Sequence, residues 1–224
     1  MANEFYIQPL ENAYVGFNCP EDTTYTPDKA LSYSLNGSTW TATTVSALQS
    51  SYIAVGANQK IYFKSDNDTP LWSDSTVYTS FCARATNSSS GTPVLFKVGG
   101  RLPSLFNNNE QALMAGAFAY SSVSDASELI LPATILSTTN CYRAMFVQCG
   151  NLTETPILPA TTLSENCYYS MFNTCTSLVE TPILPATQLS AYCYRSMFTN
   201  CSSLKIAHDL PATRLYDYSY ALMF

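Results

Sequence analysis

The sequence predicts a mainly β protein in two parts: a small β-sandwich of immunoglobulin-like size over residues 1–97, then a repeat solenoid with 26-residue coils over residues 98–224. Three observations predict this. The first part contains about eight short runs rich in β-branched and aromatic residues. In the second part the tetrad LPAT recurs at a fixed distance, as in a stack of similar units. No stretch approaches the length of apolar sequence that crosses a membrane as a helix.

The N-terminal part is expected to be a set of short strands joined by turns. Asn36–Gly37, between LSYSL and STWTAT, predicts a tight hairpin reversal, and Ala57–Lys60 predicts a second turn. Short strands with regular turns favour a sandwich. The junction with the repeats is expected within Phe96–Arg101. The expected strands are FYIQPL, YVGF, ALSYSL, TWTATTV, YIAVG, KIYFKS, VYTSFCA and VLFKV.

The repeats align on LPAT, which begins at Leu131, Leu158, Leu184 and Leu210, with one extra residue in the first copy. A degenerate copy over 101–122 places Ala117–Phe118 where the later copies have Met-Phe. One coil cannot bury its apolar side alone, so recurring residues should form ladders between neighbouring coils. The expected buried ladders are Cys141, Cys167 and Cys193; Cys149, Cys175 and Cys201; Met145, Met171 and Met197; and Phe146, Phe172 and Phe198.

Two local patterns predict the shape of each coil. The Leu-Pro step should end a strand, because proline cannot donate a ladder hydrogen bond and restricts the residue before it. The segment CYxxMF has apolar residues three and four apart, which predicts one or two helical turns packed on the same core.

The pattern CxxLxxxPxLPATxLxxxCYxxMF resembles the BspA-like branch of leucine-rich repeats, whose usual form is CxxLxxIxLPxxLxxIGxxAFxxC. The resemblance covers roughly half the chain, and this sequence departs from it in a longer coil, in CY for IG and in MF for AF. It implies a leucine-rich-repeat fold and an N-terminal module of the kind that precedes such repeats. It also implies an origin in gut Bacteroidota or in their tailed phages, with a role in surface adhesion or virion decoration.

The cysteines favour packing over chemistry. The two cysteines of each coil are eight residues apart, which is not a zinc spacing, and no histidine accompanies them. We expect two ladders of buried thiols, with disulfides inside a coil as the alternative. Cys19 and Cys82 could pair, but the start of the chain shows no secretory signal, which favours reduced thiols.

The composition and motifs argue against several classes of function. Ten Lys and Arg against 16 Asp and Glu, with no basic run, disfavour nucleic acid as a partner. The single histidine, His208, has no evident nucleophile or orienting acid, and we expect it at a solvated position. Phosphate-binding loops and the motifs GxSxG and HExxH are absent. We therefore expect a protein that is not an enzyme and has no cofactor or metal.

The candidate binding surface consists of aromatic and arginine residues that differ between copies. Tyr142, Tyr168, Tyr194 and Tyr220 recur in every copy and should be structural, whereas positions that vary are free of the packing constraint. Exposed aromatic residues near arginine suit recognition of a glycan or a protein. The alternative is that tyrosine merely tolerates a half-wet ladder edge. The candidates are Arg143, Tyr169, Tyr192, Arg195, Tyr216 and Tyr218.

These observations together predict a non-enzymatic binding or adhesion module. The leading hypothesis is a phage virion structural or decoration protein of fibre type, assembled in the bacterial cytoplasm and displayed on the virion surface. Its partners would be a host cell-surface protein or glycan. It would also contact neighbouring chains, either in a homo-oligomer or with other virion proteins. No membrane insertion is expected. The alternatives are a bacterial cell-surface adhesin whose leader was removed and a purely structural spacer. The last copy stops at YALMF within the repeat, so we expect either further residues after Phe224 or another chain over this end.

Overall fold

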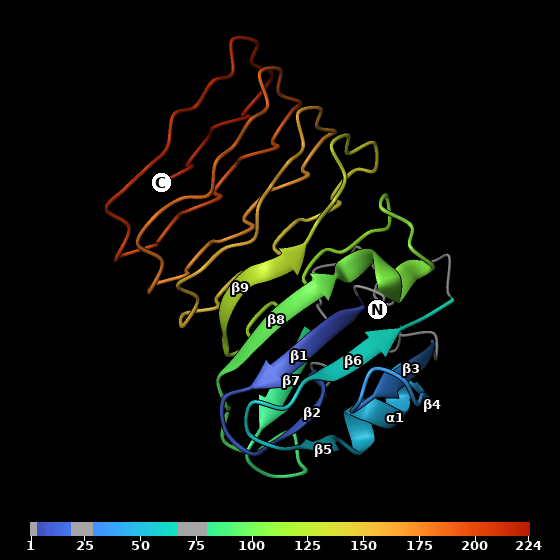
Figure 1. Cartoon of the computed structure of the whole chain (residues 1–224). Helices are drawn as coiled ribbons and strands as arrows, with labels where there is room; N and C mark the ends of the chain where they lie inside the picture. The colour runs from blue at the N-terminus through green and yellow to red at the C-terminus, as the bar shows by residue number, and fades with distance from the viewer. Residues whose placement is uncertain (1–3, 19–28, 67–79) are drawn as a thin grey trace.

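A computed structural model describes residues 4–18, 29–66 and 80–224 (Figure 1). Within these ranges the protein is mainly β, with two sheets and very little helix. The strands are β1 (Phe5–Pro9), β2 (Ala13–Asn18), β3 (Ala30–Ser34), β4 (Thr41–Thr44), β5 (Ile53–Val55), β6 (Ile61–Lys64), β7 (Ser80–Arg84), β8 (Phe96–Arg101) and β9 (Val123–Ile130); the helices are α1 (Val45–Ser50) and the 3-10 helix η1 (Leu102–Phe106).

The strands expected in the N-terminal part are confirmed as β1 to β8, although the start of VYTSFCA lies outside the described residues. β3 and β4 pair as the expected hairpin, but their connection is longer than a tight reversal. The side-chain oxygen of Asn36 accepts hydrogen bonds from the amides of Ser38 and Thr39 at 2.9 and 2.8 Å, and so holds a wider loop. The turn expected at Ala57–Lys60 is confirmed by the amide of Gln59, which donates to the carbonyl of Gly56 at 3.0 Å.

The two sheets share one core of aromatic rings. One sheet has the strand order β4-β3-β6-β1-β8-β9 and the other the order β5-β2-β7. The ring centroid of Phe81 on β7 lies 5.1 Å from that of Phe5 on β1 and 4.3 Å from that of Phe17 on β2. Such ring pairs add to the free energy gained by burying apolar area, so they hold the sheets in contact.

Strand β8 joins the N-terminal sheet to the repeats. It pairs antiparallel with β1 and parallel with β9, so the boundary expected between residues 97 and 98 falls inside a strand. The buried core is likewise continuous from Phe5 to Met223. β9 ends at Ile130, directly before Leu131–Pro132, as the Leu-Pro pattern predicts.

The later repeats lie side by side as a row of similar loops (Figure 1). On one side of the row, isolated parallel bridges join residues one repeat apart: Ile135 with Thr162, Thr162 with Gln188, and Gln188 with Arg214. In these repeats the Leu-Pro step is flanked by such bridges rather than by named strands. The row is therefore held by backbone hydrogen bonds between equivalent positions.

The segments CYxxMF lie on the opposite side of the row, which we call the turn face. The prediction of helical turns there is wrong, because the described backbone forms successive turns and no helix. Equivalent residues Ala144, Ser170 and Ser196 have φ of 52°, 54° and 53°. A left-handed residue ends any right-handed helix. Alternate amides also donate to the next repeat, as Tyr142 does to the carbonyl of Cys167 at 2.9 Å, so they are not available for bonds within a helix.

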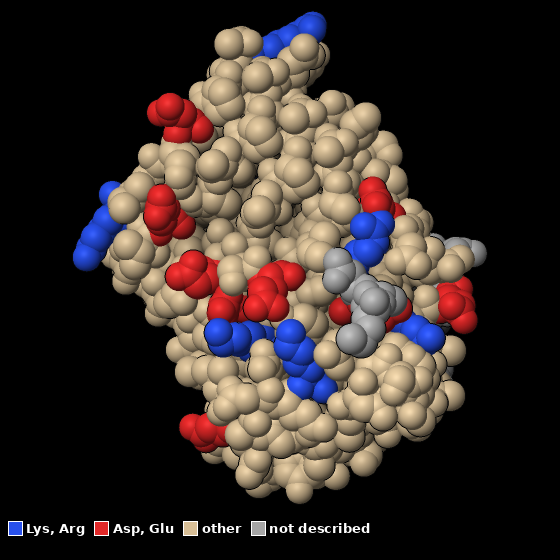
Figure 2. Space-filling view, in the orientation of Figure 1, with Lys and Arg blue, Asp and Glu red and all other residues tan. Residues whose placement is uncertain are grey.

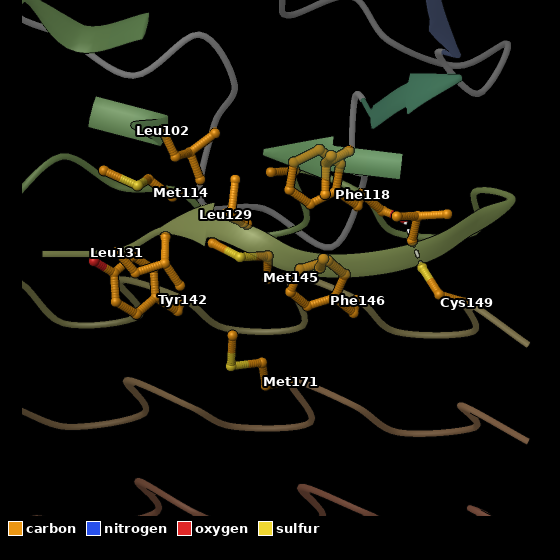
Figure 3. Close-up of a cluster of buried hydrophobic side chains, with 14 of the residues drawn as sticks. Leu102, Met114, Phe118, Leu129, Leu131, Tyr142, Met145, Phe146, Cys149 and Met171 are labelled. Carbon is orange, nitrogen blue, oxygen red and sulfur yellow. Dashed lines mark hydrogen bonds between the residues drawn. The ribbon is translucent and has the colours of Figure 1, made fainter. Parts of the chain in front are cut away.

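The Met, Phe and Cys ladders are buried, which confirms their predicted place in the core (Figure 3). Phe118, Phe146, Phe172 and Phe198 stack with centroid spacings of 5.2, 5.5 and 5.7 Å. The position of Phe118 at the head of this stack confirms the register inferred for the degenerate copy. The recurring tyrosines form a second buried stack, with 5.8 Å between the Tyr142 and Tyr168 rings and the same distance between those of Tyr168 and Tyr194.

The described cysteines are free and buried. The thiols of Cys149, Cys175 and Cys201 each donate to the carbonyl of a phenylalanine in the preceding repeat, at 2.9, 3.1 and 3.1 Å. This places one row of thiols as weak donors along the core edge. Cys82 is also buried, and Cys19 lies outside the described residues, so the structure does not test their pairing.

The repeat cysteines should resist alkylation in the folded protein. Burial raises the pKa of Cys149 and Cys193 to about 12 and that of Cys201 to about 11, so the reactive thiolate is scarce at neutral pH. Mass spectrometry should find the six repeat cysteines unlabelled by iodoacetamide in native buffer and labelled in denaturant without reductant. Recovery of linked Cys167–Cys175 peptides would instead establish disulfides.

Candidate binding surface

Five of the six candidate surface residues lie together on the turn face. The guanidinium carbons of Arg143 and Arg195 lie 5.0 and 5.7 Å from the ring centroid of Tyr169, and the three residues come from equivalent positions in successive repeats. Arg195 also lies 5.6 Å from the ring of Tyr192 and 5.7 Å from that of Tyr218. We call these residues, Arg143, Tyr169, Tyr192, Arg195 and Tyr218, the aromatic–arginine patch.

The repeat spacing itself builds this patch. Tyr192 and Tyr218 occupy one column, and their rings stack with centroids 5.2 Å apart and planes inclined by 8°. Neighbouring repeats repeat the same backbone, so side chains at equivalent positions are brought within stacking distance. Tyr218 is 61% exposed and the other four are partly buried, so the patch is rigidly packed but open to solvent.

Tyr216 is not part of the patch. It comes from a different position in the repeat, and its ring lies 5.9 Å from the guanidinium of Arg214. Its ring is 54% exposed, so Tyr216 and Arg214 form a separate surface pair of the same chemistry.

The patch carries positive charge that the described residues do not neutralise. Neither Arg143 nor Arg195 forms an ion pair within residues 4–18, 29–66 and 80–224, and the Nε atoms of both are buried without a hydrogen-bond partner there. The chain as a whole has a net charge of −6. A planar guanidinium presents paired donors that match carboxylate or phosphate groups, so the patch suits a ligand with acceptor groups.

His208 has a structural setting that the sequence did not indicate. The sequence predicts a solvated position, and the side chain is 36% exposed; it also contacts the preceding repeat, with Nε2 3.3 Å from a carboxylate oxygen of Glu180 and Nδ1 2.7 Å from the carbonyl of Thr181. These contacts make it a link between neighbouring repeats. Across the described ranges, His, Cys, Asp and Glu form no group of three that could hold a metal.

Sequence reasoning missed a groove between the six-stranded sheet and the first repeats. Its walls include Tyr6, Trp40 and Lys64 from the N-terminal part and Glu128 and Ile157 from the later part. These residues are far apart in the sequence and share no motif, so no pattern links them before the chain is folded.

Comparisons of the chain with protein-family models, with curated proteins and with solved structures found no match. Within the described residues, no helix has both the length and the apolar character needed to cross a membrane.

Proposed function

We propose that this chain is a non-enzymatic binding module that contacts a cell surface through the aromatic–arginine patch. The proposed fold is a BspA-like leucine-rich-repeat solenoid for the repeats and a β-sandwich for the N-terminal part, with strand β8 shared between them. The observation that carries the functional proposal is the patch itself, in which two arginines that form no ion pair with any described residue are packed against stacked tyrosines.

The physical argument is that the patch is costly to maintain without a ligand. The Nε atoms of Arg143 and Arg195 are buried and have no hydrogen-bond partner among the described residues, and a buried donor without a partner lowers stability. Tyrosine and arginine held in a fixed geometry lose little entropy on binding, which is why such residues dominate binding energy in interfaces. The patch therefore suits a partner that offers carboxylate, phosphate or other acceptor groups on a host surface protein or glycan.

The proposed setting is the surface of a phage virion, as a decoration or fibre-type protein that contacts the bacterial host. The support is the resemblance of the repeats to the BspA-like branch. Detection of the chain in purified virions would favour this setting, whereas its recovery in washed outer-membrane fractions would favour a bacterial adhesin.

The test is a variant with Arg143, Tyr169, Tyr192 and Arg195 all replaced by alanine. We expect it to lose binding to Bacteroidota cells, measured by flow cytometry with fluorescent protein over a panel of strains. The loss should exceed about tenfold in affinity, because each truncated anchor contributes on the order of 1 kcal/mol or more.

The matched control is Arg214→Ala with Tyr216→Ala, which removes the same residue types from the separate pair. It should bind as the wild type does. Circular dichroism must show that both variants are folded. Unchanged binding by the folded quadruple variant would contradict the assignment of the patch.

A further inference from the structure

The groove between the six-stranded sheet and the repeats has the size and lining of a small-molecule site. Its volume is about 1070 Å³, slightly above the usual range for ligand pockets. Lysine or arginine and acidic side chains meet across the middle of this face of the molecule (Figure 2). The groove shares no residue with the aromatic–arginine patch.

Strand alternation builds an aromatic floor in the groove. Phe5 and Ile7 of β1 are buried in the core, so Tyr6 between them faces the other side of the sheet, and Tyr62 of β6 does the same. Tyr6 is only 6% exposed, so the accessible ring surface belongs to the partly buried Tyr62 and Trp40. The two rings meet edge to face with centroids 5.9 Å apart. Gly99 is opposite Tyr6, and a Cβ there would lie 2.3 Å from the Tyr6 hydroxyl, so glycine leaves room for the ring. Trp40 adds a third ring.

Both hydrogen-bond donors, from lysine, and hydrogen-bond acceptors, from glutamate, lie around these rings. The ammonium of Lys60 lies 3.8 Å from the Tyr6 ring centroid and 3.7 Å from a carboxylate oxygen of Glu128, which also accepts a hydrogen bond from the Tyr6 hydroxyl. Burial and that bond raise the pKa of Tyr6, so its hydroxyl keeps its proton. The ammonium of Lys64 lies 4.2 Å from the Trp40 ring centroid.

The formal charge of the groove lining is zero, since the lysines at 60 and 64 are matched by Glu4 and Glu128. A net charge of zero does not favour an anion or a cation. Lysine supplies donors only and carboxylate supplies acceptors only, so a ligand group that both donates and accepts can use both. A hydroxyl is such a group.

We infer that this groove binds a neutral oligosaccharide. The negative faces of the aromatic rings attract the C–H groups on the apolar face of a sugar, and its hydroxyls reach the lysine and glutamate side chains. The sugar displaces a lysine ammonium from the ring it covers, and the flexible stem lets that ammonium turn to a hydroxyl. The volume accommodates several sugar units. An extended peptide is disfavoured because the floor is the face of β1 and β6, which are inner strands of the sheet and leave no free edge there for a peptide to pair with.

Trp40 provides a direct readout of occupancy. The full chain with Trp72→Phe retains Trp40 as its only tryptophan. We expect saturable changes in its fluorescence with at least one of maltotetraose, cellotetraose, mannotetraose and chitotetraose, and no change with tetragalacturonate. Calorimetry should give the same affinity.

Variants test the assignment of the floor. Tyr62→Ala should weaken that binding at least about tenfold, whereas Tyr62→Phe, which keeps the ring, should retain it. Tyr120→Ala removes a tyrosine that is 57% exposed outside the groove and should have no effect. The quadruple patch variant should also bind the oligosaccharide normally, so failure at one site is distinguishable from failure at the other.

Three results would overturn the inference. One is the absence of binding by every neutral tetrasaccharide. Another is binding that survives Tyr62→Ala in a folded protein. The third is binding of tetragalacturonate or of an extended peptide in preference to the neutral sugars.

Discussion

Replacing Met171 with aspartate should lower the free energy of unfolding by at least about 4 kcal/mol. Met171 is fully buried, and its carbonyl accepts a hydrogen bond from the amide of Phe146 at 2.9 Å. Met145 and Met171 project from successive repeats into the same core (Figure 3). Aspartate at this position would bury an unpaired charge, or a neutral acid without partners, between stacked apolar rings.

Two controls separate charge burial from other effects. Met171→Leu nearly conserves volume and should cost less than about 1.5 kcal/mol. Ile183→Asp introduces the same charge on a side chain that is 65% exposed, and it should change stability by no more than about 0.5 kcal/mol. Urea unfolding followed by circular dichroism measures all three. In thermal unfolding, a Met171→Asp midpoint within about a degree of the wild-type midpoint would contradict the placement of the Met ladder in the core.

Gly100→Ala should destabilise the protein by about 3 kcal/mol or more, through the junction of β1, β8 and β9. Gly100 has φ of +73°, and a Cβ there would lie 2.0 Å from the carbonyl oxygen of Glu4. The clash is with backbone rather than with a flexible side chain, so β1 and β8 would have to separate. The bridge between Glu4 and Arg101 would be strained as a result.

Gly37→Ala is the matched control because Gly37 has the same φ of +73°, but a Cβ there would meet only ordinary van der Waals contact, with the nearest atom on Tyr62 at 3.7 Å. It should cost about 1–2 kcal/mol, the strain of a left-handed residue alone. The difference between the two variants, measured by urea unfolding, isolates the clash. Equal losses would show that the strands can move apart freely.

The strands and the buried ladders could be predicted because each depends on a local period. Buried and less buried residues alternate along β1 and β6, and Met-Phe recurs in the repeats; both patterns can be read directly along the sequence. The expected strand TWTATTV ends at Val45, the first residue of α1, and the sequence pattern predicts no helix there, although Thr44 is the N-cap and its side chain accepts a hydrogen bond from the amide of Ala47 at 3.2 Å. A six-residue helix gives too few periods to outweigh the β-branched residues before it.

The turn face could not be predicted because two backbones satisfy the same pattern. Apolar residues three and four apart suit a helix, but they suit turns with a left-handed residue every fourth position equally well. One set of left-handed positions holds Ala144, Ser170, Ser196 and Leu222, and the sets on either side hold asparagine only in some repeats, at Asn140, Asn166 and Asn200, so glycine, the usual signal, is missing. Hydrogen bonds to neighbouring repeats offset the strain, and these exist only after stacking.

The candidate site divides in the same way. The residues of the aromatic–arginine patch occupy equivalent positions that are visible when the repeats are aligned. The structure brings together five of the six candidate residues. Tyr216 is a candidate because its position also differs between copies of the repeat, but such variation does not show on which side of a repeat a residue lies. The groove brings together Tyr6, Trp40 and Glu128, which are far apart in the sequence and line one cavity only after the chain has folded.

The one-way hydrogen bonds of the turn face make the row of repeats electrically polar. Tyr142, Tyr168 and Tyr194 each donate an amide to the following repeat, at the carbonyls of Cys167, Cys193 and Ser219. The alternate peptide units that bond between repeats therefore point the same way, each with a dipole of about 3.5 D, whereas the dipoles of ordinary β-strands largely cancel. Their N–H ends face the later repeats, so each added repeat lengthens the aligned dipole. Anionic groups are stabilised toward the C-terminal side of such a row and cationic groups toward its N-terminal side.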